Sequence, residues 1–302
     1  MTGQQVSFFI SLFHLFASLV PRSMHRFFAS TGNHLIFLIL KRNREIVEEN
    51  IRTIGRGKYT EKEVSWLAKR CFQNYSHKLL DYMTMHRLNS SNQGDWVEKE
   101  VGEENLKKAL AGGRGVICVT PHLSHWELGG YVLASKGYPI NILTLREESQ
   151  YLSRYEERLR KKAGIKTIII DLKERPNFAI LEIIKRLRGN EIVAMVADRI
   201  HGEEGIEVEF FGQPTLFPSG PAHLAFETGA AIVPVFVVLE KKMRYWGIIR
   251  EPISMSEGGT KEEAIRQCLQ EIGTSFEEVI SQYPDQWFNF FPYWKKKVGQ
   301  RV

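Results

Sequence analysis

The sequence predicts an α/β fold with a mostly parallel central sheet covered by helices. From about residue 100 onward, short apolar runs rich in β-branched residues alternate with amphipathic segments of helical period. Runs that are apolar throughout are typical of strands buried on both faces, and their alternation with helices is typical of parallel sheets. The 302 residues, 43% of them hydrophobic, suffice for a large core.

The apolar runs place the strands, and the amphipathic segments place the helices. We expect strands at 115–120, 139–145, 166–170, 192–197, 231–239 and 244–250. We expect helices at 125–136, 149–163, 177–188, 219–228 and 260–282. C-terminal helix caps are expected at Gly137, Gly164, Gly189 and Gly229.

The part of the chain before residue 100 is expected to be helical. Residues 45–88 have a helical pattern, and Thr60 followed by Glu63 indicates a capping box. The sequence therefore predicts an N-terminal membrane-associating helical segment, residues 1–44, followed by one domain, residues 45–302.

The N-terminal segment contains an apolar run, "VSFFISLFHLFASLV" (6–20), that carries no formal charge. It is shorter than the ~20 residues that comfortably span a bilayer. Cations follow it at Arg22, Arg26 and in "KRNR" (41–44). Apolar segments flanked by cations favour association with an anionic membrane surface. The alternative is a helix buried in the core.

Charge and cysteine content narrow the class of protein. The net charge of +6 favours an anionic partner, with solubility alone as the alternative. A nucleic-acid binder is not expected, because the basic residues are interspersed with 35 acidic ones and no binding motif is present. The three cysteines form no CxxC pair, so neither a disulfide framework nor a zinc site is expected.

The stretch "TPHLSHWELGG" (120–130) places titratable side chains directly after an apolar strand. Functional groups of α/β proteins gather at the carboxyl ends of strands. His122, held by a nearby carboxylate such as Glu127, would be suited to act as a general base. The alternatives are a helix-capping histidine with a surface glutamate, or metal ligation that includes His125. The spacing differs from the HExxH zinc helix, and no metal is predicted.

"HLSHWE" (122–127) has the form His-x4-Glu and resembles the HX4(D/E) signature of glycerolipid acyltransferases. It is most similar to the version found in the late acyltransferases of lipid A biosynthesis, the lauroyl and myristoyl transferases. The resemblance extends in order through "REIVEENIRTI" (44–54), "LTLREE" (143–148), "RGNEIVAMVADR" (188–199), "FFGQPTLFPSGPAHLAFETGAAIVPV" (210–235) and "PDQWFNFFPYW" (284–294).

The resemblance implies a glycerolipid acyltransferase-like fold and transfer of a fatty acyl chain from a thioester. The donor would be acyl carrier protein or acyl-CoA, with no other cofactor, and the acceptor would be a hydroxyl of a glycolipid, a lipid A precursor first of all. His122 would be the general base and Glu127 would orient it. The implied location is the cytoplasmic face of a bacterial inner membrane. The basic clusters at 158–162 and 295–297 would suit docking of an acidic carrier protein or lipid phosphates, with an ordinary solvated surface as the alternative.

Further positions of the matching segments are candidates for substrate binding. Arg146 follows a strand and could clamp a phosphate, with a surface ion pair as the alternative. Asp198 and Arg199 end another strand, where a structural salt bridge and a substrate contact are both open. Gly212 would shape a loop, and Thr215 would bind substrate or cap a turn.

The sequence departs from the family pattern at two places. Ser124-His125 replaces Gly-Asn inside the signature, so His125 is either a contact to the acceptor or, as we favour, a solvent-exposed side chain. The C-terminal block lacks the family's basic run. These departures leave open another phospholipid or glycolipid acceptor, or a non-catalytic lipid-binding protein. A serine hydrolase is not expected, because no Gly-x-Ser-x-Gly elbow is present.

Overall fold

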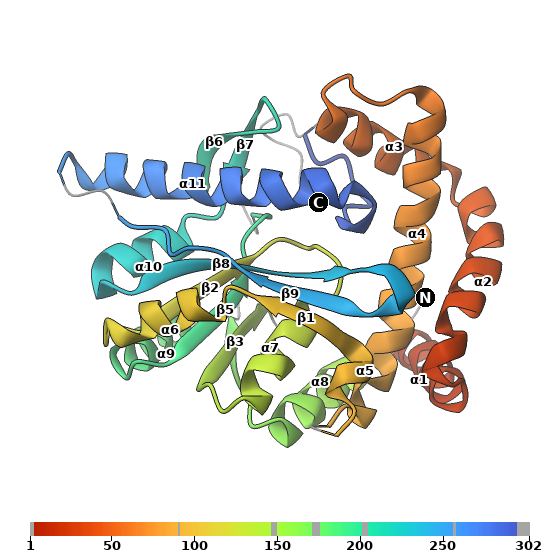
Figure 1. The fold of residues 1–302 in the computed structure, drawn as a ribbon, viewed down its shortest axis with the longest axis horizontal. Coiled ribbons are helices and arrows are strands. Elements are labelled where there is room, and N and C mark those ends of the chain that lie inside the picture. The colour runs from red at the N-terminus through yellow and green to blue at the C-terminus, as the bar shows by residue number, and fades with distance from the viewer. Residues whose placement is uncertain are drawn as a thin grey trace.

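The computed structural model describes residues 3–89, 91–145, 150–170, 176–200, 205–255 and 258–294. Within these residues a seven-stranded sheet has the order β1-β9-β8-β2-β5-β3-β4 (Figure 1). Its strands are β1 (Val97–Val101), β2 (Val116–Thr120), β3 (Ile140–Leu145), β4 (Lys166–Ile170), β5 (Ile192–Val196), β8 (Ala231–Leu239) and β9 (Tyr245–Ile249). A separate antiparallel hairpin joins β6 (Ile206–Phe210) to β7 (Gln213–Phe217).

The sheet is mostly parallel, as predicted. β2 pairs in parallel with both β8 and β5, and β3 pairs in parallel with β5 and β4. The direction reverses between β8 and β9, so β9 and its parallel neighbour β1 form an antiparallel margin. All five residues of β2 are buried, which explains why its sequence is apolar throughout rather than alternating.

Helices cover both faces of the sheet (Figure 1). On one face lie α6 (Glu103–Ala111), α7 (Trp126–Ser135) and α8 (Gln150–Lys162). On the other lie α9 (Pro176–Arg188), α10 (Gly220–Thr228) and α11 (Lys261–Gln282), together with the hairpin. The remaining helices are α1 (Gly3–Leu19), α2 (His25–Ile39), α3 (Lys41–Gly55), α4 (Glu61–Thr84) and the short α5 (Gln93–Trp96).

Local sequence signals set several helix ends. Thr60 and Glu63 form the predicted capping box at the start of α4, each satisfying a backbone N–H that the first turn leaves unpaired. Gly189 directly follows α9, as predicted, and the residue with positive φ is the next one, Asn190. The Asn190 side chain accepts a hydrogen bond from the backbone N–H of Gly115 and donates to the Leu110 carbonyl, which offsets the cost of that conformation.

Strand β1, helix α6 and the β6–β7 hairpin were not predicted. β1 reads "VEKEV" and lies at the edge of the sheet, where three of its five side chains are exposed. An edge strand of this kind lacks the continuous apolar run that identifies buried strands. The hairpin packs on α11 rather than in the sheet, so its short strands alternate exposed and buried side chains.

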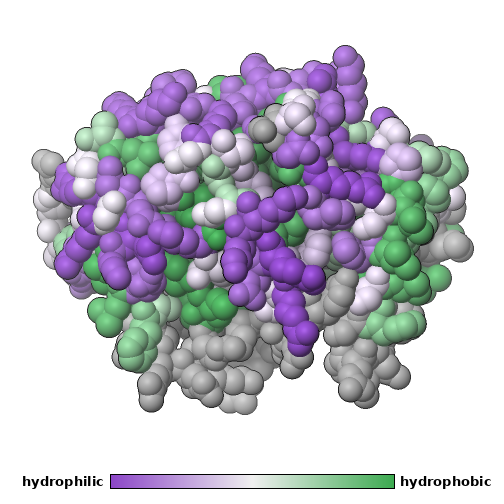
Figure 2. All heavy atoms as spheres, turned by 90° about the horizontal axis from the view of Figure 1, so that it is seen from below, coloured by the Kyte–Doolittle hydropathy of each residue, from purple (hydrophilic) through white to green (hydrophobic). Residues whose placement is uncertain are grey.

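The N-terminal helices pack on the domain and also expose apolar side chains. α1 contacts α4 and α8, and α2 contacts α4, while the predicted boundary at 44/45 falls within α3. Figure 2 shows hydrophobic residues at the right-hand end of the molecule, where α1 and α2 lie in Figure 1. The exposed large apolar side chains of this region are Phe8, Leu12, Leu15, Phe16, Leu19, Met24, Phe27, Leu38, Ile39 and Leu40.

This exposure argues against the alternative of a helix buried in the core. Leu19, for example, keeps 76% of its surface exposed. Within the described part of the chain, none of the helices combines the length and the apolar character needed to cross a bilayer.

Candidate functional site

Two neighbouring strands deliver the central pair of side chains, His122 and Asp198. β2 and β5 are adjacent and parallel, with Thr120 opposite Val196 at their carboxyl ends. The backbone N–H of Ala197 donates to the carbonyl of Thr120 at 2.9 Å, which keeps the strands together for one more residue. His122 and Asp198 each stand two residues beyond the Thr120–Val196 pair, so the shared register places them side by side.

The Asp198 carboxylate holds His122 at two points. His122 Nδ1 lies 2.5 Å from Asp198 Oδ1, and the backbone N–H of His122 donates to Oδ2 at 3.0 Å. The Asp198 side chain is fully buried, whereas 19% of the His122 side chain is exposed. The sequence indicated Glu127 as the partner of His122, whereas in this structure the carboxylate at His122 Nδ1 is that of Asp198.

The C-terminal segment completes the surroundings of Asp198. Trp287 Nε1–H donates to Asp198 Oδ2 at 2.9 Å, and the Tyr293 hydroxyl donates to the Asp198 carbonyl. The same segment fixes the loop that carries His122, because the Phe288 N–H donates to the His122 carbonyl at 2.9 Å. The sequence pointed to "PDQWFNFFPYW" only as a matching block and did not reveal this role.

The charge state of Asp198 determines which nitrogen of His122 carries a proton. Burial alone would raise the pKa of Asp198, but the adjacent His122, its hydrogen bonds and Arg199 outweigh burial and hold the pKa well below the usual carboxyl range. An ionised carboxylate only accepts hydrogen bonds, so Nδ1 of a neutral His122 must be the donor. The lone pair is then on Nε2, the tautomer that a general base requires.

Glu127 belongs to a neighbouring polar cluster. Its Oε1 lies 3.3 Å from Lys78 Nζ of α4, and its Oε2 lies 3.6 Å from His125 Nδ1. Burial raises the pKa of Glu127, but the positive charge of Lys78, the contact with His125 and a backbone hydrogen bond together outweigh burial and lower the pKa to about 2. Glu127 is therefore a carboxylate that neutralises Lys78 within the protein.

His125 was expected to be exposed to solvent, and that expectation is wrong. The side chain is fully buried, and its ring packs edge-on against Tyr245. Burial lowers the pKa of His125 and so favours the neutral ring at neutral pH. With no accessible surface, His125 offers an acceptor no contact in this structure.

A cavity of about 790 Å³ opens beside His122 at the carboxyl edge of the sheet. Its lining includes the polar side chains of Glu127, Glu156, Arg160 and Arg199. It also includes the apolar side chains of Leu143, Leu145, Ile170, Ile180, Ile183, Ile184 and Leu224. A cavity lined by both polar and apolar side chains suits an amphipathic molecule.

Only some of the other predicted binding residues line this cavity. Arg199 lines the cavity, and its guanidinium donates to the Asn289 side chain and to the Phe288 carbonyl. Gly212 and Thr215 lie on the β6–β7 hairpin and are not among the residues that line this cavity. Arg146 lies outside the described residues. Among the described residues, no cluster of His, Cys, Asp and Glu is arranged to hold a metal ion.

The cluster around Glu127 predicts how stability depends on pH. The folded state lowers the pKa of Glu127 from 4.5 to about 2 and also lowers that of His125 below 6.5. Both shifts mean that the unfolded chain binds more protons than the folded chain. The stabilisation is therefore fully present above the ordinary pKa values of 4.5 for Glu127 and 6.5 for His125, and it is lost as pH falls. We expect the free energy of unfolding, measured by urea denaturation, to decrease from pH 7 toward acid. Glu127→Gln should flatten the part of this decrease below pH 4.5, and an unchanged slope there would contradict the assignment.

Comparison with known proteins identifies the family. Residues 1–296 match the bacterial lipid A biosynthesis acyltransferase family. A phosphatidylinositol mannoside acyltransferase of Mycobacterium tuberculosis H37Rv is 32% identical over 199 residues, which are 66% of this chain and 60% of the relative. A protein of the same name from Mycolicibacterium smegmatis is 31% identical over 191 residues, which are 63% of this chain and 60% of the relative.

The matched region thus spans about 60% of the length of these relatives. The family match, in contrast, covers almost the whole chain and includes both strand ends that carry His122 and Asp198. The chain therefore belongs to the bacterial lipid A biosynthesis acyltransferase family.

Proposed function

We propose that this protein transfers a fatty acyl chain from a thioester to a hydroxyl of a glycolipid, with His122 as general base. The observation that carries this proposal is the His122–Asp198 pair, whose His122 lines a cavity with both polar and apolar side chains. Membership of an acyltransferase family supports the same reaction.

The geometry suggests a direct transfer. His122 Nε2 accepts the proton of the acceptor hydroxyl as its oxygen forms a bond to the thioester carbonyl carbon. The carbon–sulfur bond then breaks, and the thiolate takes the proton from His122, so an ester and a thiol are the products. Asp198 stabilises the imidazolium formed between these steps. A thioester is already activated, so alignment and a base supply most of what the reaction needs.

The polar and apolar side chains of the cavity suggest where each substrate would bind. The acyl chain would lie along the apolar side chains of β3, β4 and α9, where burial of each methylene group contributes about 0.8 kcal/mol. The sugar of the acceptor would lie against the polar side chains of the lining. There the Glu156 carboxylate accepts a hydrogen bond from the Tyr82 hydroxyl at 2.7 Å and pairs with Arg160 at 3.3 Å.

The acceptor is a glycolipid in this proposal. The family is that of lipid A biosynthesis, and the relatives named above are phosphatidylinositol mannoside acyltransferases. A lipid A precursor and another glycolipid therefore both remain candidates. Arg146, Gly212 and Thr215 stay proposed substrate contacts, and Glu127 a proposed catalytic residue.

The donor in this proposal is acyl carrier protein or acyl-CoA. The C-terminal half of α8 presents Arg158, Lys161 and Lys162 as exposed cations. An acidic carrier protein would be attracted to such a surface, and the attraction would weaken with salt.

We place the protein at the cytoplasmic face of a bacterial inner membrane. The exposed apolar side chains of α1 and α2, together with exposed Lys41 and Arg42 at the start of α3, suit contact with an anionic bilayer surface. These helices would hold the cavity close to lipid acceptors that do not leave the membrane.

The test is mass spectrometry of membrane lipids from cells that express the protein and from cells that lack it. The expected result is a glycolipid that gains the mass of one fatty acyl group. A gain on lipid A would identify that acceptor, and a gain on another glycolipid would place the enzyme beside the mannoside acyltransferases. No acyl difference, with folded protein present in the membrane fraction, would favour the non-catalytic lipid-binding alternative.

A further inference from the structure

Trp287 contacts the Asp198 carboxylate but is not among the residues that line the cavity at His122. Its side chain is buried, with only 3% of its surface exposed. Its Nε1–H donates to Asp198 Oδ2, the same oxygen that accepts the backbone N–H of His122. Two donors therefore hold Oδ2, and this arrangement leaves Oδ1 facing Nδ1 of the His122 ring.

The two donors fix the rotation of the Asp198 carboxylate. The last torsion of an aspartate side chain is broad and roughly two-fold, so the carboxylate by itself has no sharply preferred orientation. A hydrogen bond to an ionised group is stronger than one between neutral groups, and it selects one orientation. The backbone N–H of His122 belongs to the residue that the carboxylate has to orient. Trp287 is therefore the donor that ties Asp198 to the rest of the domain.

Trp287 is itself held by elements that are far apart in the sequence. Its neighbour Gln286 exchanges two hydrogen bonds with the backbone of Leu239 at the end of β8, at 2.7 and 2.8 Å. Two residues after Trp287, the carbonyl of Asn289 accepts a hydrogen bond from the Asn50 side chain of α3 at 3.0 Å. The indole N–H is thus presented from a rigid support, which is what a precisely oriented site requires.

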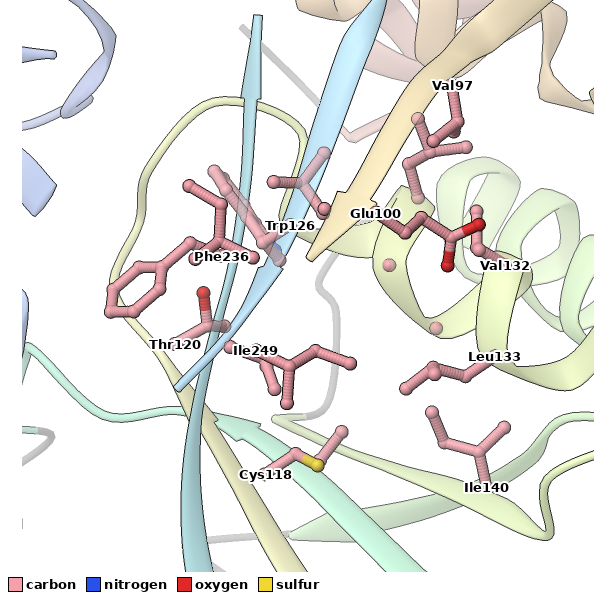
Figure 3. A pocket seen from close by; sticks show the side chains of 18 residues that line it. Val97, Glu100, Cys118, Thr120, Trp126, Val132, Leu133, Ile140, Phe236 and Ile249 are labelled. Carbon is pink, nitrogen blue, oxygen red and sulfur yellow. The ribbon is translucent and has the colours of Figure 1, made fainter. Parts of the chain in front are cut away.

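The ring of His122 has an aromatic neighbour on α7. Trp126 packs edge-on against it, with ring centroids 5.1 Å apart. Trp126 also lines, together with Thr120, a small apolar pocket between α7 and the sheet (Figure 3). This aromatic contact restricts where the imidazole ring can lie, but it does not select the rotation of the carboxylate. That selection depends on the hydrogen bond from Trp287.

We propose that Trp287 is a positioning residue for the acyl transfer. Its indole N–H holds the Asp198 carboxylate in the rotation that accepts the Nδ1 proton of His122, so that Nε2 is free to accept the proton of the hydroxyl. This inference rests on the proposed acyltransferase function and adds a residue that the His-x4-Glu signature does not contain. Because Trp287 acts through Asp198, its loss should lower the rate of the chemical step rather than weaken substrate binding.

Two tryptophan substitutions separate the hydrogen bond from aromatic packing. Trp287→Phe removes the N–H and keeps an aromatic ring. The matched control is Trp294→Phe, because Trp294 packs against Trp287 with ring centroids 5.6 Å apart. Among the described residues, the buried Nε1 of Trp294 has no hydrogen-bond partner. Both variants make the same chemical change in one aromatic cluster, and thermal unfolding checks that both are folded.

The assay follows release of the CoA thiol from palmitoyl-CoA in the presence of glycolipid extracted from cells that lack the protein. We expect Trp287→Phe to lower kcat by about ten- to hundredfold, the value of one hydrogen bond to a charged group. The KM for palmitoyl-CoA should change by less than about twofold. Trp294→Phe should retain the wild-type kcat and KM. In an Asp198→Ala background, Trp287→Phe should have no further effect, because the group through which it acts is gone.

Proton NMR tests the same hydrogen bond without turnover. The Nδ1–H proton of His122 would be assigned by its loss in His122→Ala. We expect it to exchange with water faster in Trp287→Phe than in the wild-type protein or in Trp294→Phe, because the carboxylate that accepts it is held less firmly.

The inference is overturned if the two tryptophan variants lower kcat equally, or if Trp287→Phe raises KM and leaves kcat unchanged. It is also overturned if Trp287→Phe lowers the rate by the same factor with and without the Asp198 carboxylate, or if proton exchange is equal in all three proteins. The proposed function is judged separately, by the lipid mass difference described above. A protein that transfers acyl groups but responds equally to both tryptophan variants would keep its function and lose this positioning residue.

Discussion

His122→Ala is expected to lower the rate of acyl transfer by about 10²–10⁴-fold, the range that a positioned acid–base group contributes. The substitution removes the nitrogen that accepts the hydroxyl proton and leaves the thioester, the acceptor and the cavity in place. The fold should persist, because His122 follows the last residue pair of β2 and 19% of its side chain is exposed. The measurement is transfer from an acyl-thioester donor to extracted glycolipid, followed by mass spectrometry.

The matched control for this variant is His86→Ala. His86 lies on a short 3-10 helix (Met85–Arg87) and is not among the residues that line the cavity. It should retain wild-type transfer. Near-normal turnover by a folded His122→Ala protein would refute the proposed mechanism, since no other base has been placed at the reacting hydroxyl.

Asp198→Asn is expected to reduce transfer by up to about 10⁴-fold, the scale known for the corresponding change in serine protease triads. Asp198 Oδ2 accepts hydrogen bonds from Trp287 Nε1–H and from the backbone N–H of His122. The amide oxygen of asparagine would take over these two donors, so its NH2 group would face His122 Nδ1. That arrangement holds the proton on Nε2 and removes the lone pair that the reaction uses.

Glu127→Gln provides the comparison for Asp198→Asn, because it makes the same carboxylate-to-amide change at a carboxylate that lines the cavity. Since Glu127 is bonded to Lys78 rather than to His122 in this structure, its loss should lower transfer less than the loss of Asp198. If Glu127→Gln lowered transfer more than Asp198→Asn, Glu127 rather than Asp198 would be the functional partner of His122, as the His-x4-Glu spacing indicated.

His122 could be located from the sequence because the pattern that marks it, an apolar strand followed by polar residues, lies within a few residues of it. A strand buried on both faces must be apolar throughout, and the first polar residues after such a strand stand at its end. The same logic gave the mostly parallel sheet and nearly all of its helices. It failed for β1, whose residues are exposed or half-buried, and for the β6–β7 hairpin, whose exposed and buried residues alternate, because neither contains such a run.

The partner of His122 was decided only by the tertiary structure. Glu127 is five residues away in sequence, but α7 begins at Trp126 and directs it toward Lys78 of α4. Asp198 is 76 residues away and becomes the partner because β5 is the neighbour of β2 in the sheet, an order that periodicity along the chain does not encode. The sequence by itself determined which residues end strands. The pairing of those strands, and the return of Trp287 and Tyr293 to cover Asp198, depended on long-range packing of the whole chain.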